Sequence, residues 1–458
     1  MRSFKLLSRT LLLGFVLSFS TAVFAKTPPP ISQVPIKDKA AVFYIDTLST
    51  FSMVYNLIYN VIRSDGSTNK QIVFTYPSAN YLNYAFPFDV ANFKNANGQV
   101  DNYVVYPNMG NNSLDLVKIP NHDFTLRTTQ QIPYTFSAPV GNILSLRLEI
   151  GKDSAGRPMP VVAIHFNTLG SGTNTGTLTS TSTATATGTG TFPTFFSTIE
   201  LIYFSGTWHS LYNSGTSQLA NRSFNGNLGL TLDTGTNGTV GASVVFYKLS
   251  SFPITATSGL VSLDYNFTGT PAVGAPVFIP GSNGNNSFTT ARFSVSNSFL
   301  IIESFLPSPF GSFHCSSRVA GQPWSALSQC LTNTTNATPL INNLGLGGNL
   351  SFISIALATT PASPSNKDLY FQLIDSTNTV LNPIFSLLVD GGSKRFDWTS
   401  IAKDFGNSMF YVLALRNQGP NNYLDLYGIN PSAGPLVQFF ATVDNLSYIL
   451  QAKILPLD

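Results

Sequence analysis

The chain has 458 residues, of which 43% are hydrophobic and only 10% are charged. This length and hydrophobic content suffice for large buried cores and suggest two or three domains. The formal charge of +3 comes from the first 25 residues, which hold three of the 24 basic residues and no acidic ones. The rest of the chain is formally neutral, which argues against nucleic acid and anionic lipid surfaces as partners.

Residues 1–25 have the three-part layout of a secretory signal peptide. A basic start with Arg2, Lys5 and Arg9 precedes an apolar stretch, and Ala25 marks the expected cleavage site. The apolar stretch is short and interrupted by serine and threonine, so it does not suit a retained membrane span. The sequence therefore predicts an exported protein that is secreted, periplasmic or held at the cell surface. No integral membrane segment is expected once the signal is removed.

After the signal, short apolar runs alternate with clusters of Gly, Asn, Ser and Pro. The run LSLRLEI at 144–150 alternates apolar and polar residues, which is typical of a half-buried strand. Long helical periodicity is missing, so we expect a mainly β chain of two or three β-sandwich-like modules with short helices. The expected segments are a Pro-rich leader (26–39), a first β module (40–167), a Thr-rich linker or hairpin (168–193), a second β module with a Cys loop (194–340) and a third β module (341–458).

Two similar segments suggest an internal duplication of the first module in the third. FDVANFKNANG begins at Phe88 and FDWTSIAKDFG begins at Phe396, and each is expected to form a short helix capped by its aspartate and ended by its glycine. NNSLDLVKI and NNYLDLYGI follow in the same order, and a fainter third version starts with LDY at 263. This recurrence is what a duplication leaves behind. Chance similarity in a chain rich in Asn, Gly and Ser is the alternative.

A tract with threonine at every second position occupies 173–191. Its β-branched residues favour extended backbone, but a single strand of that length would reach roughly 60 Å, far beyond an ordinary strand. We therefore expect a hairpin or a solvated linker. Rows of Thr-x-Thr also resemble the faces of ice-binding solenoids, and dense hydroxyls could carry O-linked sugars; both remain alternatives.

The common catalytic motifs of nucleophilic, zinc-dependent and nucleotide-binding enzymes are missing. One motif, LTLDTGT, resembles the catalytic loop of pepsin-type aspartic peptidases, and NNLGLGG at 342–348 is similar to the segment that braces such a loop. The resemblance implies Asp233 as a catalytic candidate. Those enzymes need a second loop, since two carboxylates must share one proton, and the chain has no second Asp-Thr/Ser-Gly. The motif is also typical of a tight turn between strands.

Two glutamates, Glu200 and Glu303, lie inside apolar, aromatic runs. Burial would raise their pKa towards the range of a general acid. If both faced one cleft, they would suit a secreted glycoside hydrolase, which is our alternative function. The competing interpretation is that each points outward or is paired with an arginine. A histidine in a similar apolar run, His165, is expected to be a core residue.

The class that the sequence favours is an exported, non-catalytic β protein that binds or structures neutral glycan-like or cell-surface material. Few charges with many Asn, Ser, Thr and aromatic side chains suit recognition of hydroxyl-rich surfaces, where rings stack and amides form hydrogen bonds. The ligand-binding candidates are Trp208, Tyr203, Tyr212 and Trp324. Core packing is the alternative role for each of them.

The chain has two cysteines, Cys315 and Cys330. In an exported protein we expect them to form one disulfide. Together with His314 they would provide three metal ligands, whereas a structural zinc site needs about four. We therefore expect no metal and no cofactor.

Overall fold

The computed structural model describes the following residues: 37–47, 54–76, 87–108, 110–111, 113–133, 143–170, 194–212, 228–248, 259–282, 288–293, 298–305, 312–319, 321–331, 339–340, 351–360, 363–375, 385–388, 395–403, 409–418, 421–430, 436–446 and 449–457. Asp38–Asp458 form one compact unit. The described part is nearly all β, so the prediction of a mainly β chain is confirmed. It contains no helix that is long and apolar enough to cross a membrane.

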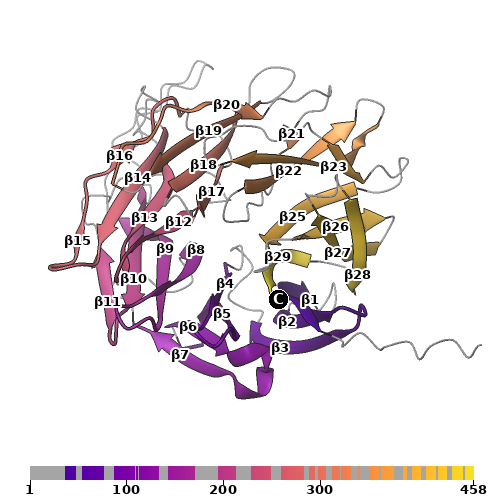
Figure 1. Cartoon of the computed structure of the whole chain (residues 1–458), viewed down its shortest axis with the longest axis horizontal. Coiled ribbons are helices and arrows are strands. Elements are labelled where there is room, and N and C mark those ends of the chain that lie inside the picture. Colours follow the sequence, from indigo (N-terminus) through magenta and orange to yellow (C-terminus); the bar gives the residue numbers. More distant parts are fainter. Residues whose placement is uncertain are drawn as a thin grey trace, which may run out of the picture. The chain divides into compact units, whose positions relative to one another are not determined.

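The described strands form seven antiparallel sheets that follow one another along the chain (Figure 1). We call them blades 1 to 7. Blade 1 holds β29 (Ile449–Pro456), β1 (Asp38–Thr47), β2 (Tyr55–Arg63) and β3 (Thr68–Tyr76). Blade 2 holds β4 (Asp89–Lys94), β5 (Val100–Asn108), β6 (Ser113–Ile119) and β7 (Thr128–Ile132). Blade 3 holds β8 (Ile143–Lys152), β9 (Pro158–Gly170), β10 (Thr194–Phe204) and β11 (Trp208–Tyr212).

The remaining blades have the same order of strands. Blade 4 holds β12 (Gly229–Gly235), β13 (Gly238–Lys248), β14 (Gly259–Asn266), β15 (Ala272–Val273) and β16 (Val277–Phe278). Blade 5 holds β17 (Phe288–Phe293), β18 (Ser298–Phe305), β19 (Ser312–Val319) and β20 (Ser328–Leu331). Blade 6 holds β21 (Pro339–Leu340), β22 (Ser351–Thr360), β23 (Ser363–Asp375) and β24 (Phe385–Leu388). Blade 7 holds β25 (Arg395–Lys403), β26 (Phe410–Gln418), β27 (Asn421–Asn430) and β28 (Leu436–Leu446).

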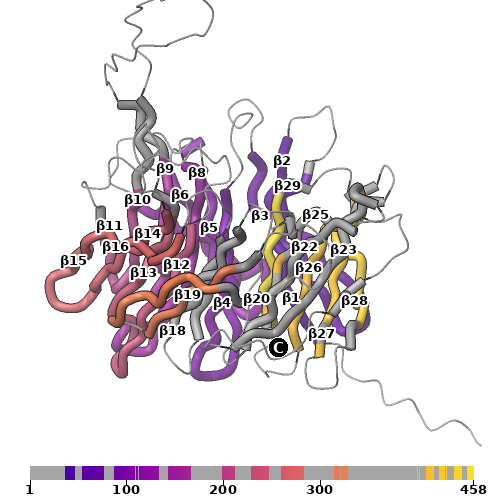
Figure 2. The backbone as a smooth tube through the Cα atoms, turned by 90° about the horizontal axis from the view of Figure 1, so that it is seen from above, coloured from indigo at the N-terminus to yellow at the C-terminus, as the bar shows by residue number. Residues whose placement is uncertain are grey.

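The last strand of the chain completes the first blade. β29 pairs with β1 from Ala40↔Pro456 to Asp46↔Ile449, and the two lie side by side in Figures 1 and 2. The first strands of neighbouring blades also contact one another: β29 contacts β4, β4 contacts β8, β8 contacts β12, β12 contacts β17 and β25 contacts β29. Sheets of four or five strands that follow one another along the chain, contact through their first strands at five junctions and are closed by the last strand have the topology of a β-propeller. The β-sandwich modules that we expected are not found in the described part.

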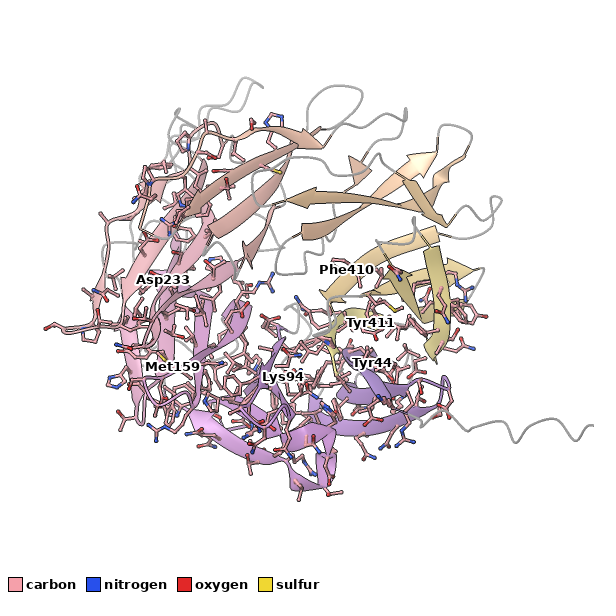
Figure 3. All side chains as sticks on the ribbon, in the orientation of Figure 1. Tyr44, Lys94, Met159, Asp233, Phe410 and Tyr411 are labelled. Atoms are coloured by element: carbon pink, nitrogen blue, oxygen red, sulfur yellow. The ribbon has the colours of Figure 1, made fainter. Side chains whose placement is uncertain are left out.

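Both faces of a blade are buried, and β1 shows how the sequence achieves this. Phe43 on one face packs into a cluster with residues of blade 2. Tyr44, on the opposite face, packs into a cluster with residues of blade 7 that includes Tyr411. Figure 3 shows Tyr44 and Tyr411 close together at the boundary of blades 1 and 7. A strand buried on both faces is apolar at consecutive positions, whereas a sandwich strand alternates with polar residues.

The prediction of two short helices is wrong for the described residues, because both segments form strands. Asp89 begins β4, and its carboxylate accepts a hydrogen bond from the backbone N–H of Leu148 in blade 3 at 2.8 Å. It therefore joins two blades and caps no helix. The segment from Phe396 likewise forms part of β25. Burial between neighbouring blades outweighs the local capping pattern.

The two similar segments occupy equivalent strands in two blades. FDVANFK contributes β4 and FDWTSIAK contributes β25, which are the first strands of blades 2 and 7. NNSLDLVKI contributes β6 and NNYLDLYGI contributes β27, the third strands of the same blades. The LDY at 263 lies in β14, the third strand of blade 4. The recurring unit thus corresponds to one blade.

The Thr-rich tract connects two strands of the same blade. β9 ends at Gly170 and β10 begins at Thr194, and these two residues pair across the antiparallel ladder. The tract itself lies outside the described residues. Its position inside blade 3 means that the module boundary expected at 168–193 falls within one sheet.

Candidate functional site

A cleft of about 790 Å³ lies between blades 1 and 2. One wall is formed by the start of β1, the end of β2 and the first half of β3, including Asp38, Arg63 and Ile72. The opposite wall is the turn that follows β6, which contains two 3-10 turns, η2 (Pro120–His122) and η3 (Phe124–Leu126). The cleft is therefore assembled from segments that lie about fifty residues apart in the sequence.

The turn on the second wall has an unusual backbone conformation. Asn121 has φ +45° and His122 has φ +64°, so two consecutive non-glycine residues are left-handed. Such residues cost on the order of 1 kcal/mol each, and they persist where the surrounding structure holds them. Asparagine and histidine are both enriched among the non-glycine residues that adopt this region. Strain of this kind at a cleft is a marker of a functional site.

Hydrogen bonds from the core hold the strained turn. The backbone N–H of Asn121 donates to Oδ1 of Asp101 at 3.1 Å, and the Tyr59 hydroxyl donates to the His122 carbonyl at 3.3 Å. The side-chain amide of Asn102 lies 3.2 Å from Nδ1 of His122. Tyr59 and Asn102 are both buried, and burial raises the pKa of Tyr59, so its hydroxyl keeps the proton that it donates.

His122 is held as a neutral imidazole. Burial lowers its pKa below the usual value of 6.5, against the opposing effect of Asp38 and Asp101. The Asn102 amide nitrogen lies 3.2 Å from Nδ1, and it can donate to that ring nitrogen in the tautomer that carries its proton on Nε2. The imidazole is thus held in one orientation in the lining of the cleft.

The charges that line the cleft are of both signs. Arg63 forms an ion pair with Asp38 at 3.2 Å, and Lys70 forms one with Asp444 at 2.7 Å. Asp123 accepts hydrogen bonds from the backbone N–H and the hydroxyl of Thr125, which hold the pKa of its carboxyl below the usual range. Asp123 therefore stays ionised. The cleft offers guanidinium, ammonium and imidazole donors next to carboxylate acceptors.

An apolar strip accompanies these polar groups. Phe124 lines the cleft and stacks on Tyr59, with ring centroids 5.8 Å apart and an interplanar angle of 17°. The Arg127 guanidinium lies 4.3 Å from the centroid of the Phe124 ring. On the other wall, Ile72 is 51% exposed. Apolar surface flanked by donors and acceptors matches a sugar ring, which has a C–H face and a rim of hydroxyls.

The two glutamate candidates are not brought together. Glu200 lies in β10 of blade 3 with no exposed surface, and its carboxylate accepts a hydrogen bond from the Ser210 hydroxyl. Glu303 lies in β18 of blade 5, where its backbone pairs with Phe288 and His314; its side chain lies outside the described part. Blade 4 comes between these two blades along the chain. A completely buried Glu200 cannot reach a substrate in this conformation.

Asp233 lies at a tight turn. It is half-buried near the end of β12, and Gly235 pairs with Gly238 so that two residues connect β12 to β13 (Figure 3). Gly238 has φ +111°, and an added Cβ would lie 2.7 Å from the carbonyl oxygen of Lys152. The Asp-Thr-Gly motif therefore belongs to a hairpin that packs closely on blade 3. The segment 342–348 lies outside the described residues.

The aromatic candidates serve largely as packing. Tyr203 is buried and stacks on Phe267, with ring centroids 4.3 Å apart. Trp324 is also buried, and the Arg318 guanidinium lies 4.7 Å from its ring centroid. Trp208 is half-buried against the cluster shared by blades 2 and 3. Tyr212 ends β11, and its side chain lies outside the described part.

The cysteine positions lie on neighbouring strands. Cys315 is buried in β19, which pairs with β20, where Cys330 resides next to the His314↔Gln329 pair. The Cys330 side chain lies outside the described part, so the disulfide stays a prediction. Within the described residues, no group of three or more His, Cys, Asp and Glu side chains is arranged to hold a metal ion.

Sequence reasoning missed the cleft between blades 1 and 2. The Pro120-Asn121 pair is a turn signal, and His122 with Asp123 places two polar functional groups directly after it. That combination was the available clue. The partners from β2 and β5 could not be assigned without the fold.

Comparisons with known proteins give no family. Neither a protein-family model nor a curated protein sequence matches the chain. Among solved structures, the chain is similar to an arginine-to-alanine mutant of AofleA from Arthrobotrys oligospora, with 9% identity, a TM-score of 0.45 and coverage of 82% of this chain and 91% of that one. It is similar to the six-bladed fungal lectin of Aleuria aurantia, with 9% identity, a TM-score of 0.37 and coverage of 78% and 96%. It is also similar to a mutant of the NanB sialidase from Streptococcus pneumoniae, with 8% identity, a TM-score of 0.37 and coverage of 88% and 87%.

Proposed function

We propose that this protein is exported and binds a hydroxyl-rich glycan, without cleaving it, in the cleft between blades 1 and 2. The observation that carries the proposal is the strained His122 turn, which buried Tyr59 and Asn102 hold against the cleft. Backbone strain and buried polar partners together indicate a site with a fixed geometry. The signal-like residues 1–25 support export to a place where such glycans occur.

The charges of the cleft favour binding over hydrolysis. A glycoside hydrolase needs one carboxylic acid with a raised pKa and a second carboxylate. Asp123 has a lowered pKa, and Asp38 is paired with Arg63. Glu200, the other acid proposed for this chemistry, is completely buried in blade 3. A secreted hydrolase is therefore the alternative hypothesis, and one experiment tests both glycan binding and glycan hydrolysis.

The test mixes the chain lacking residues 1–25 with insoluble polysaccharides and whole cell walls. It records loss of protein from the supernatant and release of reducing ends. We expect binding without release. Release of reducing ends that disappears in Glu200→Gln or Glu303→Gln would replace the binding role with a hydrolase.

A matched pair of variants tests the cleft itself. Arg63→Gln removes a guanidinium that lines the cleft and pairs with Asp38. Arg157→Gln removes one that pairs with Asp153 in a hairpin of blade 3, outside the cleft. We expect Arg63→Gln to weaken retention about tenfold, as loss of a charged hydrogen bond does, and Arg157→Gln to leave it unchanged. Equal retention of both variants would place the glycan site elsewhere.

A further inference from the structure

Three charged side chains from three consecutive inner strands meet at the junction of blades 1, 2 and 3. Lys453 of β29 places its Nζ 3.5 Å from Oδ1 of Asp89 in β4. Arg147 of β8 places its Nη1 4.0 Å from the same oxygen. Figure 1 shows β29, β4 and β8 as the inner strands of their blades. This cluster is separate from the cleft, none of whose lining residues belongs to it.

The cluster has more positive than negative charge. Asp89 is the one carboxylate among the described residues within ion-pair distance of Arg147 or Lys453. Its other oxygen, Oδ2, already accepts the backbone N–H of Leu148 at 2.8 Å. One carboxylate with a single shared oxygen therefore faces two cations.

Arg147 is fixed in place and cannot relieve the excess by losing its proton. Its Nε donates to the carbonyl of Leu228, and its Nη1 lies 3.4 Å from the carbonyl of Leu146. A guanidinium keeps its charge at all accessible pH values. Burial first, and then the Arg147 charge, lower the pKa of Lys453, against the opposing effect of Asp89. The two cations thus repel each other across Asp89.

Both cationic side chains are partly exposed. The Arg147 side chain is 29% exposed and the Lys453 side chain is 26% exposed, whereas Asp89 is 10% exposed. The carboxylate is therefore the more enclosed member, and the two cationic side chains keep part of their surface exposed. A guanidinium fork next to an ammonium is the donor set that proteins use for carboxylates and phosphates.

We propose that Arg147 and Lys453 bind a small oxyanion at the inner strands of blades 1 to 3. The ligand is a phosphate, a sulfate or a carboxylate group, which share the planar or tetrahedral set of oxygens that Arg147 can hold with two N–H donors. The anion balances the excess positive charge that Asp89 leaves. Asp89 competes with the ligand for the same two cations.

The experiment measures thermal unfolding of the purified full chain with phosphate, sulfate or acetate, at constant ionic strength balanced with chloride. We expect a saturable rise in Tm with at least one of these anions. A rise in Tm with acetate alone would identify a carboxylate site. A rise with phosphate or sulfate alone would identify a site for tetrahedral anions. Each of these results supports the proposal. No rise with any of them would overturn it.

Three variants separate the site from a general salt effect. Lys453→Met removes a cation, so we expect the apparent Kd to rise at least about tenfold. Asp89→Asn removes the competing carboxylate, so we expect tighter anion binding than in the native chain. Lys94→Met is the matched control, because it makes the same Lys-to-Met substitution five positions along β4 from Asp89, roughly 17 Å away. It should leave the Kd unchanged. Lys94 is labelled in Figure 3.

An equal rise in Tm for the native chain and Lys453→Met would indicate a general salt effect and refute the site. If Lys453→Met does not fold, the anion affinity of Asp89→Asn tests the proposal. Tighter binding in Asp89→Asn supports the proposal, and unchanged or weaker binding overturns it. Because the cleft is untouched, glycan retention in these variants is an independent measurement.

Discussion

The side-chain amide nitrogen of Asn102 lies 3.2 Å from Nδ1 of His122, and it couples the buried part of blade 2 to the cleft. This contact requires a neutral imidazole, since a protonated Nδ1 would direct a second N–H at the amide. Burial of His122 acts in the same direction and lowers its pKa below 6.5. We therefore expect the geometry of the cleft to depend on pH.

We predict that His122 titrates with a midpoint below 6.5 and that retention on the glycan falls over the same range. Histidine ring signals in an NMR titration give the midpoint directly, without any ligand. In Asn102→Asp, a carboxylate replaces the donor and stabilises the imidazolium, so the midpoint moves to higher pH. An unchanged midpoint in that variant would show that the Asn102 contact does not control His122.

His165 makes folding stability depend on pH. It is buried in β9, as the sequence predicted, and burial lowers its pKa to about 4. Above the unfolded value of about 6.5 the ring is neutral in both states, so it adds no pH dependence. Between 6.5 and 4 the unfolded chain binds the proton and the folded chain does not, so stability falls as the pH falls. The total loss is about 3 kcal/mol.

Urea unfolding at pH 7 and pH 4.5 measures this effect. We expect His165→Leu to lose less stability between the two pH values than the native chain, by about 2–3 kcal/mol. The matched control is His209→Leu, on the edge strand β11, where the ring is half-buried. The assignment to His165 fails if its variant and the control show the same pH dependence.

The strands could be predicted from the sequence, but their arrangement could not. The run LSLRLEI forms β8, and VVAIHF forms part of β9. The assembly into sandwiches was wrong because a blade and a sandwich both contain short antiparallel strands. The discriminating signal was burial on both faces, seen in the unbroken apolar run AAVFYI of β1. Such a run predicts a layer on each side of the sheet.

The candidate site was less predictable from the sequence than the strands were. Its two walls come from residues 38–72 and 121–127, which only the packing of blade 1 on blade 2 brings together. The Pro120-Asn121 pair signals a turn, but it does not predict that Asn121 and His122 are left-handed. The glutamate reasoning recognised that Glu200 is buried, but burial in blade 3 also removes it from any substrate.

The ion pair between Arg318 and Asp264 joins blades 4 and 5, and its two side chains are buried to different extents. Nη1 of Arg318 donates to Oδ2 of Asp264 at 2.9 Å, and Nη2 contacts Oδ1. The Arg318 side chain is 5% exposed, whereas that of Asp264 is 48% exposed. Removal of the aspartate therefore leaves a buried cation, while removal of the arginine leaves a carboxylate that water can solvate.

We predict that Asp264→Asn costs more stability than Arg318→Met. The first change should cost about 2–3 kcal/mol, because the guanidinium loses a charged acceptor in a buried position. The second should cost about 1 kcal/mol, since the methionine still covers the Trp324 ring. Denaturant unfolding of both variants gives the order, and a larger loss for Arg318→Met would contradict the argument.

The Thr-rich tract offers a test of the blade topology. Because Gly170 and Thr194 pair directly, residues 171–193 can be replaced by a four-residue turn without changing the ladder of β9 and β10. Closing a shorter loop costs less entropy, so we expect the shortened chain to be more stable by about 1.5 kcal/mol. Urea unfolding measures the change, and a permuted tract of equal length and composition is the control. The opposite outcome is a shortened chain that unfolds more easily, while the permuted tract leaves stability unchanged. That outcome would mean that the length of the tract stabilises blade 3. The tract could not then be an insertion into a complete hairpin.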